Sequence, residues 1–296
     1  MNQQPIQLLR SRDFGSLLQD SIQFFIKNFK GLVVPVLLYA GPLMILQGIA
    51  LGLYQANVLD FQEKMLSGTV STGQGPFDQL FATYFSPAFV LSSLMGMLVY
   101  VMMVSLVNQY LMLYVQRGSA ADIEMEEVRQ GAFGDFLPNL GAALLTGLLI
   151  FAGTMLFIFP GIYVAVPCSF VFIIMKYEGI GIGAALSRAF ALIRGHWWQT
   201  FFFLLLLYII VSVVGSLFQV PMYLSAFAKI MHIELFASKT FLIIGGLMSS
   251  VGSNLLYVLI IVGVALQYFN LLDVEGGSNF YDQRIDQIGR DEAAEA

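Results

Sequence analysis

Charged side chains are scarce in this chain of 296 residues. It has 14 Lys and Arg and 19 Asp and Glu, so charged residues make up 11% of the sequence, against about 25% in a typical soluble domain. Hydrophobic residues make up 58%, and the mean hydropathy is +0.78. A soluble protein of this size needs more charged groups to cover its surface. The composition therefore predicts an integral membrane protein.

Other scarcities exclude further classes of function. The single cysteine excludes a disulfide framework, and two histidines leave little for a zinc site. The net charge of −5, without a basic stripe, argues against a nucleic-acid partner. Gly179, Gly181 and Gly183 do not have the spacing of a nucleotide-binding loop. No cofactor or metal is predicted.

Six stretches contain no Asp, Glu, Lys or Arg and approach the length that a helix needs to cross about 30 Å of hydrocarbon. They are residues 31–54, 88–113, 139–159, 161–175, 197–219 and 241–268. Their apolar residues are continuous rather than alternating, which favours helices over the strands of a membrane barrel. The sequence therefore predicts an all-α integral membrane protein with six transmembrane helices, in one membrane domain over residues 1–272.

The third and fourth spans belong to one uncharged run, residues 139–175. A single helix of that length would measure about 55 Å, far more than the hydrocarbon thickness. Phe159, Pro160 and Gly161 lie near its middle. Proline removes a backbone donor and glycine permits a reversal, so a hairpin turn is predicted at these three residues.

The distribution of Lys and Arg predicts the orientation. With both termini cytoplasmic, three basic residues lie outside, namely Lys64, Lys229 and Lys239. Eleven lie inside, namely Arg10, Arg12, Lys27, Lys30, Arg117, Arg129, Lys176, Arg188, Arg194, Arg284 and Arg290. This asymmetry follows the positive-inside rule. Residues 1–30 contain no apolar core typical of a cleavable signal, so a multi-pass membrane protein with both termini cytoplasmic is expected.

Three amphipathic segments precede pairs of spans: residues 13–30, 122–137 and 183–196. Aromatic residues on the apolar side of the first favour a position in the headgroup plane. The alternative is a helix packed on the protein's own cytoplasmic side. In the second segment, Ser119 and Asp122 predict an N-terminal capping box.

The order of surface helix, span and span occurs three times, which suggests a threefold internal repeat. The similarity is one of pattern, and a chance alternation of loops and spans explains it equally well. Residues 273–296 are predicted to be a polar cytoplasmic tail whose last residues are disordered.

The predicted spans contain no ionisable residue of the kind that marks proton carriers, charge-lined channels or aspartyl intramembrane proteases. Their most polar side chains are assigned to interhelical hydrogen bonds; they are Asn108, Gln109, Asn254 and Gln267. Prolines in or beside the spans are expected to kink or break helices; they are Pro42, beside Gly41, Pro167 and Pro221, which closes the fifth span.

Small residues recur every four positions in the last span, at Gly245, Ser249 and Ser253. Such a face lets two helices approach closely. Packing within the chain is the favoured interpretation. Homodimerisation through this face is the alternative, so the oligomeric state stays open.

Basic and aromatic residues near the cytoplasmic face are candidates for lipid contact. The candidate headgroup contacts are Lys27, Lys30, Arg188 and Arg194. Positive-inside orientation alone would also place such residues there. The candidate interfacial anchors are Trp197 and Trp198, at the start of the fifth span.

Residues 159–201 carry four short motifs in a fixed order. They are Pro-Gly-Ile-Tyr at 160–163, Lys-Tyr-Glu-Gly at 176–179, Ala-Leu-Ser-Arg-Ala-Phe at 185–190 and Ile-Arg-Gly-His-Trp-Trp at 193–198. This order resembles the bacterial six-span family that includes the membrane domain attached to some glycerophosphodiester phosphodiesterases. The resemblance implies a bacterial inner-membrane protein. It carries over no catalytic residue, because the soluble catalytic barrel of those enzymes has no counterpart here.

These observations predict a non-catalytic accessory or scaffold protein that works with membrane lipids or with another membrane protein. The alternative is a transporter of a lipid or other hydrophobic solute. A wide cavity between the spans would favour transport, and a solid bundle would count against it.

Overall fold

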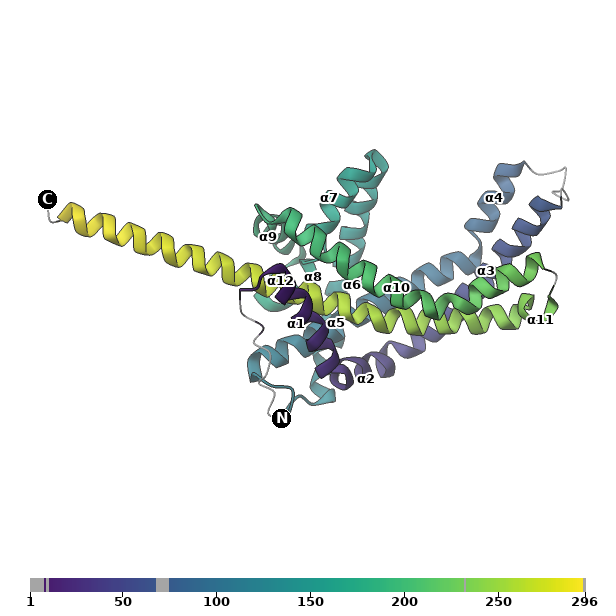
Figure 1. The fold of residues 1–296 in the computed structure, drawn as a ribbon, viewed down its shortest axis with the longest axis horizontal. Helices are drawn as coiled ribbons and strands as arrows, with labels where there is room; N and C mark the ends of the chain where they lie inside the picture. Colours follow the sequence, from purple (N-terminus) through teal and green to yellow (C-terminus); the bar gives the residue numbers. More distant parts are fainter. Residues whose placement is uncertain (1–7, 9–10, 68–74, 232, 295–296) are drawn as a thin grey trace.

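The computed structural model describes residues 8, 11–67, 75–231 and 233–294, and within them it contains helices and turns but no strand (Figure 1). Arg10 lies outside the described residues, as do the side chains of Arg284 and Arg290. The helices are α1 (Phe14–Lys27), α2 (Phe29–Tyr39), α3 (Gly41–Leu66), α4 (Pro76–Tyr84), α5 (Pro87–Arg117), α6 (Met125–Leu156), α7 (Ile158–Cys168), α8 (Val171–Glu178), α9 (Ile182–Ile193), α10 (Trp197–Ile230), α11 (Glu234–Ala237) and α12 (Lys239–Ala294).

Six helical segments are long and apolar enough to cross a membrane. They are Gly41–Met65, Leu80–Arg117, Met125–Leu156, Ile158–Glu178, Trp197–Lys229 and Lys239–Gly276. Their length and composition confirm the predicted all-α membrane class.

The centre of the bundle is α12. Its most apolar window is 78% buried within the protein, whereas that of α6 is 17% buried. Glycines let α12 approach α3 closely, because a side chain on Gly246 would overlap the carbonyl oxygen of Gly48. A Cβ on Gly52 would lie 2.6 Å from the Cα of Ile243. Close backbone contact of this kind is how helices pack in lipid.

The small-residue face of α12 is covered by α10 of the same chain. A Cβ on Gly245 would lie 3.1 Å from Met222 Cγ and 3.3 Å from Pro221 Cβ. Ser249 is buried, and the Ser253 hydroxyl is buried without a hydrogen-bond partner among the described residues. The contact at Gly245 leaves no room there for a helix of a second copy.

The first predicted span, residues 31–54, is not one straight helix. Helix α2 ends at Tyr39, and a new helix, α3, begins after Ala40; the 66° bend between α1 and α2 lies before this span. Pro42 lies in the first turn of α3. Backbone N–H groups in a first turn have no intrahelical acceptor, so proline loses no helical hydrogen bond there. The apolar crossing therefore begins at Gly41 and runs beyond residue 54 to Met65.

The predicted surface helix 122–137 is not a separate element. It is the first part of α6, which continues through Pro138 to Leu156. The N-terminus of α6 carries a capping box formed by Glu124 and Glu127, not by Ser119 and Asp122. A proline removes one backbone hydrogen bond, but surrounding protein can stabilise the interrupted helix.

The turn predicted at residues 159–161 lies slightly earlier. The chain reverses at Phe157, whose backbone is extended, and Pro160 is the third residue of α7. Proline is tolerated in a first helical turn because the N–H groups there lack intrahelical acceptors. A break at Ser169 and Phe170 then separates α7 from α8.

Two further predicted boundaries are wrong. Pro221 does not close the fifth span, because α10 continues through it to Ile230. The last predicted span ends at residue 268, whereas α12 continues to Ala294 and extends beyond the other helices (Figure 1).

The apolar face of α1 packs on the protein itself. Leu17 and Phe24 are fully buried, and the ring of Phe24 lies 4.9 Å from that of Tyr114. Helix α1 therefore packs on the protein, as the alternative prediction has it, and its apolar face does not lie free in the headgroup plane.

Of the three predicted repeat units, the first and third begin with a separate short helix, α1 or α9, while the second does not. The repeat stays a prediction.

Candidate functional sites

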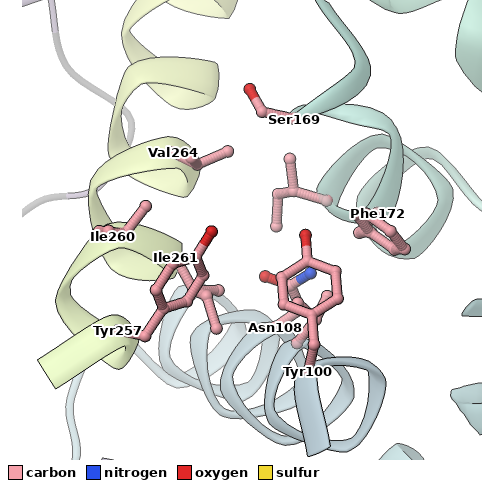
Figure 2. A pocket seen from close by; sticks show the side chains of 10 residues that line it. Tyr100, Asn108, Ser169, Phe172, Tyr257, Ile260, Ile261 and Val264 are labelled. Atoms are coloured by element: carbon pink, nitrogen blue, oxygen red, sulfur yellow. The ribbon is translucent and has the colours of Figure 1, made fainter. Parts of the chain in front are cut away.

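A small cavity lies between α5, α8 and α12, and apolar side chains form most of its lining. Figure 2 shows the Tyr100 and Tyr257 hydroxyls and the Asn108 amide pointing into one space, with Ser169 at its edge. The cavity volume is about 60 Å³. This space is large enough for a few water molecules and too small for a lipid chain.

Most of the other polar side chains in the spans connect helices. Asn254 Nδ2 donates to Gln47 Oε1 at 3.0 Å, which links α12 to α3. Gln267 Nε2 donates to Thr200 Oγ1 at 2.9 Å, which links α12 to α10. Gln109 Nε2 reaches the Glu127 carbonyl at 3.5 Å. Asn108 differs from these residues, because its amide faces the cavity between α5, α8 and α12 (Figure 2).

One end of the bundle, where α9 ends and α10 begins, carries an ion-pair cluster; we call it the α9 end. Arg188 Nη1 and Nη2 lie 2.8 and 2.5 Å from the two carboxylate oxygens of Glu275. Arg188 Nε lies 3.2 Å from Glu178, which also accepts a hydrogen bond from the Tyr268 hydroxyl at 2.9 Å. The hydrogen bond to Glu275 is the main cause that raises the pKa of Arg188 above its usual range.

This cluster corrects one predicted lipid contact. Both edges of the Arg188 guanidinium are engaged by carboxylates from α8 and α12. A bidentate pair of this geometry is strong and directional. Arg188 therefore connects three helices and is not a free cation for a lipid phosphate.

Lys27 and Lys30 lie at the bend between α1 and α2, beside a pocket of about 410 Å³. The pocket is lined by Ile26, Lys27, Asn28, Phe29, Lys30, Gly31, Tyr110, Ala120 and Ile123. Both lysines are exposed, and neither has an ion pair within the part of the chain that the structure describes. Tyr110 donates to Asn28 Oδ1 at 3.0 Å and fixes the pocket wall.

The two predicted aromatic anchors differ in their surroundings. Trp197 stacks on Tyr163 of α7 and on Phe201, with ring centroids 5.4 and 5.2 Å apart. Its indole N–H donates to the Tyr163 carbonyl at 3.2 Å. Trp198 is exposed, as is Arg194 just before α10. Trp198 is thus the more exposed of the two predicted anchors, while Trp197 also connects α10 to α7.

The aromatic cluster borders an apolar crevice of about 660 Å³ between α7 and the start of α10. Its lining is formed by Phe159, Pro160, Ile162, Tyr163, Val164, Trp197, Trp198 and Phe201. The crevice is open rather than enclosed within the bundle, and it contributes no reactive group.

The described residues contain no group of three or more His, Cys, Asp or Glu side chains that could hold a metal ion. Comparison with protein families, with curated proteins and with solved structures gave no match. The resemblance of residues 159–201 to the six-span family therefore stays a prediction.

Proposed function

We propose that this chain is a non-catalytic accessory or scaffold protein of the bacterial inner membrane. In this proposal the α9 end and both termini face the cytoplasm, and the bend between α1 and α2 binds anionic phospholipids. The pocket beside Lys27 and Lys30 is the observation that carries the proposal.

The pocket combines the two properties that such a lipid requires. Two exposed ammonium groups flank it, and neither has a carboxylate partner in the described part of the chain. Ile26 and Phe29 are exposed beside them, with 64% and 47% of their surfaces accessible. A phospholipid presents a phosphate next to apolar chains, so charge and hydrophobic contact act together.

Transport of a lipid through the bundle has less support. The cavity of about 60 Å³ between α5, α8 and α12 is too small for an acyl chain. The spaces of 410 and 660 Å³ are open pockets, one at the α1–α2 bend and one between α7 and the start of α10. The solid centre around α12 thus favours a binding or scaffold role.

Native mass spectrometry of the protein released from nanodiscs of mixed phosphatidylglycerol and phosphatidylcholine tests the lipid site, because it measures which lipid stays bound. Each lysine near an anionic surface contributes about 1 kcal/mol. The pair Lys27→Gln and Lys30→Gln should therefore weaken the preference for phosphatidylglycerol roughly 30-fold.

The matched control pair is Lys64→Gln and Lys239→Gln, which removes two exposed lysines from the ends of α3 and α12. This pair should leave the lipid preference nearly unchanged. Equal effects from both pairs would show general electrostatics and contradict a site at the α1–α2 bend. The scaffold role is tested separately by cross-linking in cells, where failure to capture any membrane protein would oppose it.

A further inference from the structure

The turn between α6 and α7 is covered with large apolar side chains that nothing in the described chain buries. Met155, Leu156, Phe157, Ile158 and Phe159 are 68–83% exposed. The one polar side chain beside them, Thr154, donates to the Ile150 carbonyl at 2.8 Å and is satisfied within α6. Such a surface is stable in hydrocarbon and unfavourable in water.

Two longer connections between the apolar helices have a different composition. The α5–α6 connection contains Asp122 and Glu124, and the α10–α12 connection contains His232, Glu234 and Ser238. A connection that emerges into water needs such polar groups. The α6–α7 turn has none at its tip.

The position of Trp197 fixes the depth of this turn. Trp197 is the first residue of α10, and its ring stacks on Tyr163 at 5.4 Å. Tyr163 lies five residues after Ile158, which corresponds to about 8 Å along α7. These two distances together cannot span about 30 Å of hydrocarbon. The tip of the turn therefore lies on the same side of the bilayer as the start of α10.

The base of the hairpin is on that side as well. Lys176 Nζ lies 2.6 Å from Asp135 Oδ2, which joins the two arms by an ion pair. Residues 136–175 between them contain no charged side chain. Glu178, just beyond Lys176, belongs to the ion-pair cluster at the α9 end. Figure 1 shows α6 and α7 projecting away from the paired α10 and α12 instead of running beside them.

We propose that the α6–α7 hairpin enters and leaves the bilayer at the α9 end, and that its apolar tip binds the acyl chains of that leaflet. Four helices then cross the membrane: α3, α5, α10 and α12. The removal of two crossings keeps both termini on one side. It also leaves the distribution of Lys and Arg unchanged, since the tip carries neither residue.

Single cysteines test this arrangement in a Cys168→Ala background, which removes the only native cysteine. Ser67→Cys at the end of α3 and Ser187→Cys on α9 report the two faces, and Phe157→Cys reports the tip. A membrane-impermeant maleimide should label Ser67→Cys from one side and Ser187→Cys from the other. It should label Phe157→Cys from neither side until detergent is added. Labelling of the tip from either aqueous side would overturn the proposal.

A spin label on Phe157→Cys in liposomes separates lipid contact from contact with protein. High accessibility to oxygen with low accessibility to a water-soluble nickel complex is expected, at a depth within the leaflet of Ser187. Low accessibility to both reagents would place the tip against protein and overturn the assignment to acyl chains. A depth in the opposite leaflet would do the same. Phe157 is exposed, so its replacement should preserve folding, which monodisperse elution verifies.

Discussion

The indole N–H of Trp197 donates to a carbonyl that lacks its usual helical donor. In an α-helix the N–H of residue 167 would bond to the carbonyl of residue 163, but Pro167 has no N–H. Trp197 from α10 supplies the donor at 3.2 Å and stacks on the Tyr163 ring. One proline and one tryptophan therefore connect two helices.

The replacement Trp197→Phe keeps a ring that can stack on Tyr163 but removes the indole N–H. It should destabilise the protein by about 1 kcal/mol, because the Tyr163 carbonyl loses this donor. Trp198→Phe is the matched control, since Trp198 is exposed, and it should change little. In a Pro167→Ala background, where the helix regains its own donor, Trp197→Phe should cost less. Unfolding in mixed micelles measures all four variants, and an unchanged cost in the Pro167→Ala background would contradict the exchange of donors.

At the scale of elements, the sequence predicts membrane segments better than helix ends. Charge-free stretches predict apolar helices because lipid excludes unpaired charges. Prolines predict boundaries poorly: the chain breaks near Pro42, while α6 and α10 continue through Pro138 and Pro221. A lost backbone hydrogen bond breaks a helix only where neighbouring groups do not stabilise it, and the sequence alone does not reveal those neighbours.

The candidate sites show the same limit. Arg188 and Lys27 carry the same charge near the predicted cytoplasmic face, so the sequence predicts lipid contact for both. The distinction depends on Glu275, which lies beyond the last predicted span, in the predicted polar tail. The continued helix positions Glu275 against Arg188. Had the last span been predicted to continue as a helix past residue 268, Glu275 could have been recognised as a partner for Arg188.

The cluster around Arg188 predicts how firmly α9 is held. Arg188→Gln should raise hydrogen exchange in α9 and cost about 1 kcal/mol, a value reduced by solvent screening because the pair is partly exposed. Arg129→Gln is the matched control. It breaks an exposed pair with Glu126 inside α6 and should leave the stability nearly unchanged. Unchanged exchange in α9 after Arg188→Gln would show that other contacts hold this helix.

At the scale of the whole molecule, the chain divides into a buried centre and a peripheral hairpin. α12 is surrounded by α3, α5 and α10, and close glycine contacts hold it there. The α6–α7 hairpin contacts this centre mainly through α5 and leaves its tip bare. The centre is suited to crossing the bilayer, and the hairpin offers its largest area to lipid.

A charged substitution at the hairpin tip shows whether the tip lies in hydrocarbon or in water, because its effect on the free energy of unfolding differs between the two. In hydrocarbon, Asp costs roughly 2.5–3.5 kcal/mol at mid-depth and less towards the interface. Phe157→Asp should therefore lower the free energy of unfolding in bicelles by about 2 kcal/mol. Met65→Asp is the matched control, because it replaces an exposed apolar side chain beside Lys64, near the water-facing end of α3, and should cost little. If the tip emerged into water, the two substitutions would have equal and small effects, because an aspartate there would stay hydrated.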